Sequence, residues 1–336
     1  MLERIFRKWE HSLSRRDTNR KIRPFEWGIE FTGDGASAGD PRKYLVEYAR
    51  AALAHSDEYH SFKPVADYRL EGRHLTFTSP VETIYPENNT VHARYFPADP
   101  RGSVVLVLPQ WNANAAGHIA LCRMLKHFGL SSMRISLPYH DHRMPKELVR
   151  ADYMLSPNLG RTLQAIRQAV IDCRAALDWL EAQGHTRFAI LGTSIGSCVA
   201  LITTAHDPRL TVSVQNHVSP YFADVVWTGI STRHVRQGLE GHVTLEDLRR
   251  IWMPISPKAY LGKLVGTGKS SMLVHALYDH SFLPRLSLQV LQDYRELGLP
   301  HSVLTLPCGH YTSGEFPFNL YLGYSMCTWL RKNLGP

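Results

Sequence analysis

The feature that most constrains the fold of this chain is an alternation of strand-like and helix-like segments that begins near residue 74. Short β-branched runs such as 103–108 (SVVLVL) predict strands that are buried on both faces. The strongest predicted helix spans residues 159–182, and Gly184 lies just past its end, where a helix stop is expected. Strands that alternate with helices imply βαβ crossovers, so we expect an α/β fold whose mostly parallel central sheet is flanked by helices.

Two regions do not follow this alternation. Residues 1–73 are expected to form an N-terminal extension before a main domain over 74–336, and a turn-rich loop is expected near 33–41. Residues 217–265 mix short helical pieces with several prolines and glycines, which predicts a helical cap inserted into the sheet. The predicted strands span 74–79, 90–96, 103–108, 132–137, 187–191, 210–215, 271–278 and 301–306, with the first two antiparallel.

Charge and cysteine usage narrow the function classes. The net charge of +8 is concentrated in residues 1–25, where eight basic residues face three acids, so the body carries no broad basic surface for nucleic acid. The five cysteines are scattered, which is typical of free thiols in a reducing compartment, and we expect a cytoplasmic location. No run of 18 apolar residues predicts a membrane-spanning helix.

The first residues form an amphipathic pattern. We expect a helix that packs its apolar stripe on the protein itself, since single amphipathic helices usually face a core. The alternative is that residues 1–20 contact a membrane surface or a partner. The apolar positions at helical spacing are Leu2, Ile5, Phe6, Trp9 and Leu13.

One short motif carries the strongest chemical signal. Residues 192–196 read Gly-Thr-Ser-Ile-Gly and match G-x-S-x-G, directly after a predicted strand and directly before a predicted helix. A turn this tight strains the backbone of Ser194 and requires neighbours without side chains at Gly192 and Gly196. It also places the Ser194 hydroxyl at the carboxyl edge of the sheet, beside the first amide groups of the helix. Ser194 is therefore the candidate nucleophile.

A serine hydroxyl needs a base, and two later strands supply candidates for a base and its orienting acid. Asp279 follows the strand predicted at 271–278, and His310 follows the strand predicted at 301–306. Parallel sheets build their sites at the carboxyl ends of the strands, so these two side chains are expected on adjacent loops.

The order Ser194, Asp279, His310 resembles that of the α/β-hydrolase superfamily, and the resemblance covers residues 74–332 without indicating a subfamily. It implies that Ser194 is the nucleophile, His310 the general base and Asp279 the acid that orients it. It also implies an acyl-enzyme released by water, with no metal or organic cofactor. We expect hydrolysis of a carboxylic ester in a small-molecule or lipid-like substrate. A thioesterase, an amidase or peptidase, and a catalytically silent binding protein remain alternatives, and the oligomeric state is open.

Other residues compete for parts of this site. Asp224 is an alternative acid, although it lies several residues inside the predicted cap. The run His140-Asp141-His142 looks metal-like, but no third ligand is indicated, so we expect it to shape a loop that borders the pocket. Further histidines near the relevant strands are His275, His280 and His301, none of which follows the last strand as His310 does.

An oxyanion hole requires two backbone N–H groups. One is expected from Ile195, and the other from the loop after strand 103–108, where the register favours Trp111 as the donor and Gln110 is the alternative. The superfamily often has His-Gly where this chain has Pro109-Gln110. Gln110, Thr193 and His140 are expected to contact substrate. The cap is interpreted either as an apolar cover with basic groups for an acidic substrate or as a solvated helical hairpin.

Overall fold

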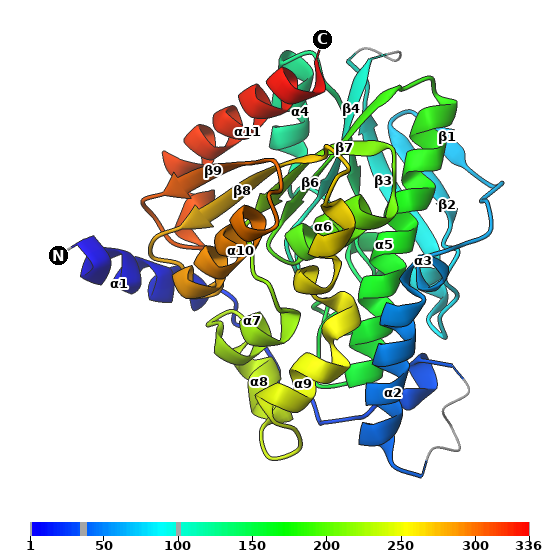
Figure 1. Cartoon of the computed structure of the whole chain (residues 1–336), viewed down its shortest axis with the longest axis vertical. Helices are drawn as coiled ribbons and strands as arrows, with labels where there is room; N and C mark the ends of the chain where they lie inside the picture. The colour runs from blue at the N-terminus through cyan, green and yellow to red at the C-terminus, as the bar shows by residue number, and fades with distance from the viewer. Residues whose placement is uncertain (1, 34–38, 99–101, 336) are drawn as a thin grey trace.

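The computed structural model describes residues 2–33, 39–98 and 102–335, and a nine-stranded sheet forms its centre (Figure 1). The strand order is β1-β2-β3-β5-β4-β6-β7-β8-β9. The strands are β1 (Arg69–Glu71), β2 (His74–Thr78), β3 (Thr90–Phe96), β4 (Ser103–Leu108), β5 (Ser131–Ile135), β6 (Arg187–Thr193), β7 (Leu210–Asn216), β8 (Ser270–Ala276) and β9 (His301–Leu306).

The sheet is antiparallel at one edge and parallel elsewhere. β1, β2, β3 and β5 pair antiparallel, whereas β5, β4, β6, β7, β8 and β9 pair parallel. Every residue of β4 is buried, as its unbroken run of β-branched and leucine side chains predicted. The mostly parallel sheet and its antiparallel start are therefore confirmed.

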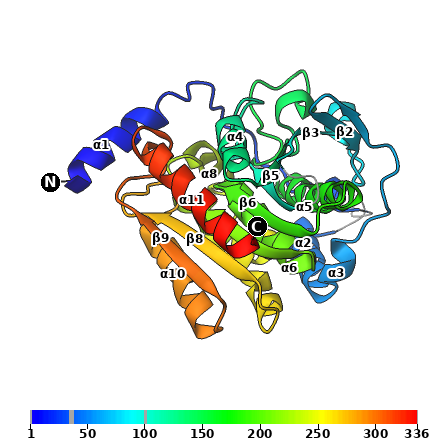
Figure 2. The ribbon, with the colours of Figure 1, turned by 90° about the horizontal axis from the view of Figure 1, so that it is seen from above.

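Helices cover both faces of the sheet (Figure 2). One core joins α4 and α11 to side chains such as Val105 and Val107, and another joins α5 and α6 to the alternate side chains Val104 and Leu106. The helices are α1 (Leu2–Ser14), α2 (Pro41–Ala54), α3 (Ser56–Tyr59), α4 (Ile119–His127), α5 (Leu159–Ala182), α6 (Ile195–His206), α7 (Phe222–Thr228), α8 (Arg233–Leu239), α9 (Leu245–Ile251), α10 (Pro284–Glu296) and α11 (Phe318–Leu334).

The segment between β7 and β8 contains α7, α8 and α9, which lie below the sheet in Figure 1. Trp252 at the end of α9 is fully buried, and its indole N–H donates to the carbonyl of Leu159 at the start of α5, 3.2 Å away. A capping box between Thr244 and Asp247 begins α9. These helices are thus packed against the body rather than solvated on all sides.

The sequence pattern missed one strand and misplaced the ends of several others, including β8. The edge strand β1 is three exposed residues long, too short for an alternation to show, and it lies within the expected extension. β8 ends at Ala276, so two residues, Leu277 and Tyr278, separate it from Asp279. The expected loop over 33–41 lies mostly outside the described residues. All five cysteines are buried and free, and no helix among the described residues is long and apolar enough to cross a membrane.

Candidate active site

Ser194 stands at the turn between β6 and α6 in a strained backbone conformation. Its φ of 57° and ψ of −120° lie in a backbone region that residues other than glycine rarely adopt. A Cβ on Gly192 would lie 2.0 Å from the carbonyl oxygen of Gly196, and a Cβ on Gly196 would lie 2.7 Å from that of Pro109. The turn therefore excludes side chains at both glycine positions, which is the steric requirement of the motif.

A cavity of about 620 Å³ lies in front of Ser194. His310 and His217 line it together with Ser194. Four other residues predicted for the site also line it, namely Gln110, Trp111, Thr193 and Ile195. Most of the remaining wall is apolar and comes from the cap, α6 and α11. Examples are Leu201, Phe222, Val225, Leu322 and Met326.

Asp279 lies behind the histidines and is engaged on both of its oxygens. Its Oδ1 accepts the backbone N–H groups of Ser281 and Phe282, each at 2.7 Å. Its Oδ2 meets Nδ1 of His310 at 3.1 Å and Nδ1 of His217 at 2.9 Å. One buried carboxylate therefore fixes the orientation of two imidazole rings.

The electrostatics separate the two histidines. Burial alone would lower the pKa of His310, but the charge and hydrogen bond of Asp279, with a smaller contribution from Glu10, raise it above the ordinary value of 6.5. For His217, burial and the nearby His310 outweigh Asp279, so its pKa is lowered. Burial would raise the pKa of Asp279, but the two histidines hold it well below its ordinary range. His310 is therefore the more basic ring.

His217 was not predicted, although it directly follows β7. Its backbone has a φ of 65°, and its Nε2 lies 3.1 Å from the hydroxyl of Ser313, so both ring nitrogens already have partners. His310 uses only Nδ1, for Asp279, and its ring stacks on Phe282 with centroids 5.3 Å apart. Within the described residues no hydrogen bond joins Ser194 to His310; catalytic hydrogen bonds are often long before substrate binds.

The loop after β4 lies opposite the elbow. The N–H of Asn112 donates to Nε2 of His140 at 2.8 Å, which leaves the amides of Trp111 and Gln110 as candidates for the oxyanion hole. The other candidate, the N–H of Ile195, is in the first turn of α6, where helical amides lack partners within the helix. The indole of Trp111 is held by Ala151, whose carbonyl accepts its N–H at 2.9 Å.

His140 is fully buried behind this loop and is not among the residues that line the cavity. Its Nδ1 donates to the carbonyl of Pro138 at 2.8 Å, which leaves Nε2 free to accept from Asn112. Burial lowers the pKa of His140 to about 4, so the ring is neutral. The structure thus places His140 where it holds the loop after β4 in shape rather than where it contacts substrate.

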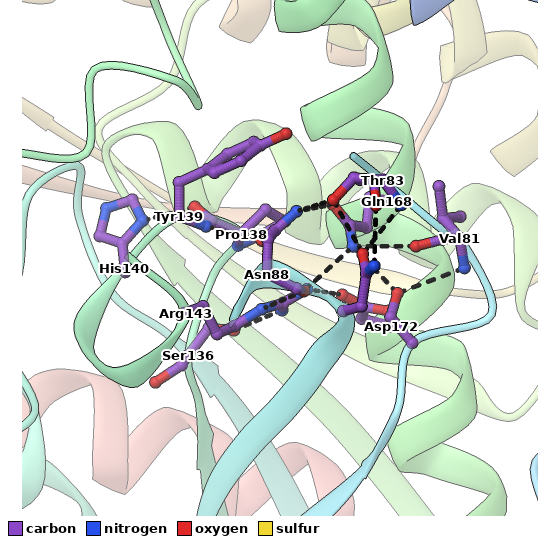
Figure 3. Close-up of polar contacts among 12 residues, drawn as sticks. Val81, Thr83, Asn88, Ser136, Pro138, Tyr139, His140, Arg143, Gln168 and Asp172 are labelled. Carbon is purple, nitrogen blue, oxygen red and sulfur yellow. Dashed lines mark hydrogen bonds and ion pairs between the residues drawn. The ribbon is translucent and has the colours of Figure 1, made fainter. Parts of the chain in front are cut away.

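A buried polar network supports the segment that carries His140 (Figure 3). Arg143 pairs with Asp172 of α5 at 2.8 Å and donates to the carbonyls of Asn88 and Ser136. The side chain of Asn88 in turn accepts the N–H of Tyr139 at 2.9 Å. Since buried charges are stable only when paired and hydrogen-bonded, this network fixes the path of the loop.

The comparisons with known proteins agree with this geometry. Residues 118–253 match the family model described as alpha/beta hydrolase domain containing 18, a span that holds Ser194 and His217 but neither Asp279 nor His310. A search of curated proteins gave no match.

Solved structures resemble the chain more widely. The acylaminoacyl peptidase of Pyrococcus horikoshii matches with a TM-score of 0.61 and 13% identity, over 81% of this chain and 42% of its own. The acetyl xylan esterase of Paenibacillus sp. R4 matches with a TM-score of 0.60 and 14% identity, over 87% of this chain and 95% of its own.

The chain has the α/β-hydrolase fold, and its residues 118–253 match a family model of the α/β-hydrolase superfamily. The resemblance drawn from the order of Ser194, Asp279 and His310 is confirmed at the level of the superfamily and of the fold. At these identities the structural likeness concerns the fold, and the chain spans less than half of the peptidase that it matches.

Within this hydrolase fold, the rival residues have other contacts. Asp224 is held by Arg249 of the cap, with oxygen–nitrogen distances of 2.6 and 2.9 Å, and among the described residues no hydrogen bond or ion pair joins it to His310. Asp141 pairs with Arg134 at 2.6 Å. His275 meets Thr305 at 2.9 Å.

Among the described residues, one group of histidines and acids is close enough to hold a metal ion, and it consists of His217, Asp279 and His310. Their candidate ligand atoms lie within 4.8 Å of one another. Hydrogen bonds through Oδ2 of Asp279 already account for this grouping.

Proposed function

We propose that the chain is a serine hydrolase that cleaves carboxylic esters through an acyl-enzyme on Ser194. The observation that carries the proposal is the strained elbow, because it presents the Ser194 hydroxyl to a cavity that His310 also lines. Asp279 supports it by holding Nδ1 of His310, which leaves Nε2 of that ring as the proton acceptor.

The proposed reaction has two halves. His310 takes the hydroxyl proton as Oγ of Ser194 attacks the ester carbonyl, and the negative charge develops on the carbonyl oxygen. The N–H of Ile195 and an amide of Trp111 or Gln110 stabilise that charge. The carbon–oxygen bond to the alcohol then breaks, and His310 returns the proton to the leaving alcohol. Water, activated in the same way, releases the acid and restores Ser194.

The cavity wall supports an apolar acyl or alcohol group. Leucine, valine, phenylalanine and methionine side chains supply much of its apolar surface, and burying an apolar substrate group against them removes that group's surface from water. The cationic side chains that reach the cavity, Arg20 and Arg150, are both engaged with Asp17. An uncharged ester therefore fits this cavity better than an anionic one.

A panel of p-nitrophenyl esters of increasing acyl length, with the matching p-nitroanilides, tests the proposal. We expect ester hydrolysis that rises with acyl length until the cavity is filled and that disappears in Ser194→Ala. Amide hydrolysis matching ester hydrolysis would favour a peptidase or amidase, for which the Pyrococcus horikoshii enzyme offers a structural parallel. Absence of hydrolysis of both by the folded wild type would contradict the proposal.

A further inference from the structure

Glu10, on the N-terminal helix α1, is fully buried against the loop that carries His310. Its Oε1 accepts the backbone N–H of Thr312 at 2.7 Å and the hydroxyl of Thr312 at 2.8 Å. Its Oε2 accepts the backbone N–H of Tyr311 at 3.1 Å. Tyr311 and Thr312, the two residues that follow His310, are therefore bound to a carboxylate that is 301 and 302 positions away in the sequence.

The loop is built closely around this carboxylate. A Cβ on Gly309 would lie 2.3 Å from Cδ of Glu10, so the residue before His310 must lack a side chain if Glu10 is to stay in place. The N–H of Gly309 donates to the hydroxyl oxygen of Thr312 at 2.6 Å, and that hydroxyl donates to Glu10. One acidic side chain thus organises the backbone on both sides of His310.

Glu10 has no ion-pair partner among the described residues, which is costly for a buried carboxylate. Removing such a group from water costs several kcal/mol, and here only amide and hydroxyl donors offset that cost. If α1 only packed an apolar stripe on the body, a leucine at position 10 would stabilise the fold more than a buried carboxylate does. The arrangement is therefore best explained by what the carboxylate does for the loop.

The rest of α1 and the segment after it meet two loops, the one that carries Asp279 and the one that carries His310. Phe6 stacks on Tyr278, next to Asp279, with ring centroids 4.9 Å apart. Arg20 donates to the hydroxyl of Tyr311 at 2.7 Å. By contrast Leu2 and Ile5 are more than half exposed, at the end of α1 that projects from the body in Figure 1. The contacts of α1 thus lie at the loops that carry Asp279 and His310 and at the start of α11.

We propose that Glu10 is a positioning residue for His310, and that the N-terminal helix is a part of the active site because it brings this carboxylate under the loop of residues 309–314. The inference rests on the proposed role of His310 as the base. It gives the N-terminal segment a catalytic purpose that is independent of any membrane or partner.

The pKa of His310 is a readout that depends on the charge of Glu10 and that a purely structural role of Glu10 would not change. The groups that face His310 are Asp279 after β8, His217 after β7 and Glu10 on α1. The two carboxylates favour the protonated form of the His310 ring. Removing the charge of Glu10 should therefore lower the pKa of His310, and the acid limb of the pH–rate profile should move to lower pH.

The test compares Glu10→Gln with the matched control Glu3→Gln, which changes an exposed acid on the same helix. In Glu10→Gln the side-chain amide faces an N–H donor of the loop, so the loop loses a hydrogen bond as well as the charge. We expect kcat to fall about tenfold with little change in KM, because misplacement of a reacting group slows chemistry rather than binding. The control should behave as wild type.

A second variant separates position from charge. Thr312→Val removes the hydroxyl that links Gly309 to Glu10 but keeps the carboxylate. It should lower kcat without lowering the pKa of His310. This variant also decides the matter if Glu10→Gln does not fold, since an unchanged kcat in folded Thr312→Val would overturn the proposal.

The pKa of His310 is best measured by NMR on protein labelled with 13C-histidine, with the resonance assigned through His310→Asn. This titration does not need turnover, so it tests Glu10 even if the chain hydrolyses none of the substrates offered. A pKa of His310 that is the same in Glu10→Gln and wild type, with kcat unchanged, would overturn the inference and leave the proposed function standing.

Discussion

Replacing Asp279 by asparagine should abolish most activity by reversing the hydrogen-bonding character of the atom between the two histidines. Oδ1 of Asp279 accepts two backbone N–H groups at 2.7 Å, so the asparagine oxygen is expected to keep that position. The amide nitrogen would then face Nδ1 of His310 and of His217, which donate to Oδ2 in the native protein. An amide donor would then replace Oδ2, the acceptor on which both imidazole N–H groups depend.

The consequence follows from the tautomer of His310. To accept a hydrogen bond from the new amide, Nδ1 of His310 must lose its hydrogen. Nε2 then carries the hydrogen, so it cannot accept the proton of Ser194. The same reversal in Ser-His-Asp hydrolases lowers kcat by about 10⁴-fold. We therefore expect kcat/KM to fall by about 10³- to 10⁴-fold, or about 4–5.5 kcal/mol of transition-state stabilisation.

The assay is hydrolysis of the best p-nitrophenyl ester, with thermal unfolding of each variant as the check on folding. The control is Asp224→Asn, which changes the alternative acid and removes only its ion pair with the half-exposed Arg249. That variant should stay within about threefold of wild type, because pairs with an exposed partner contribute little. If folded Asp279→Asn kept activity within tenfold of wild type while Asp224→Asn lost it, the assignment of the acid would be wrong.

Three further predictions concern the base, the elbow and the loop after β4. Because the base must be neutral and the pKa of His310 is raised, kcat/KM should decline as the pH falls through a value above 6.5, and a pH–rate profile with an inflection below 6.5 would contradict this. Gly192→Ala, whose Cβ would meet helix backbone at 2.0 Å, should lower the free energy of unfolding by about 1–3 kcal/mol or more. Urea denaturation should show no such loss for Gly262→Ala, where the added Cβ meets nothing within 4 Å. His140→Phe leaves the N–H of Asn112 without its acceptor and should lower kcat/KM by about 10- to 100-fold. Steady-state rates that match wild type would show that His140 is not needed to position the loop after β4.

The sequence was sufficient where local patterns coincide with tertiary structure. The run 103–108 predicts a doubly buried strand because the five side chains after Ser103 are apolar, and β4 has those bounds. The two glycines around Ser194 are readable for the same reason, since the tight turn imposes its steric demand within five residues. Asp279 and His310 were found by counting from strand ends, and the structure brings them within 3.1 Å of each other.

The parts that escaped prediction depend on contacts between distant segments. His217 directly follows a strand that was predicted one residue short, so the same counting from strand ends points to it, but a second histidine on one acid is not required by any motif. Glu10 lies four residues after Phe6 and three before Leu13, which places an acid on the apolar face of α1. An acid on an apolar helix face is visible in the sequence. The loop of residues 309–312 that Glu10 contacts becomes evident only in three dimensions.

His140 illustrates the limit in the other direction. Its position after β5 suggested the border of the pocket, but the pattern could not tell which way the ring turns. In the structure the ring points behind the loop because Pro138 and Asn112 engage both of its nitrogens. A buried neutral histidine with two backbone partners is a structural element, and only the hydrogen-bond partners distinguish it from one that meets substrate.

The central claim is that Ser194 is an activated nucleophile, and covalent labelling with a fluorophosphonate probe tests it most directly. The folded wild type should be labelled, and mass spectrometry of its peptides should place the adduct on Ser194. Labelling should be absent from Ser194→Ala and from heat-denatured wild type, and strongly slowed in His310→Ala. A folded wild type that resists the probe, or an adduct that persists in Ser194→Ala, would contradict the account.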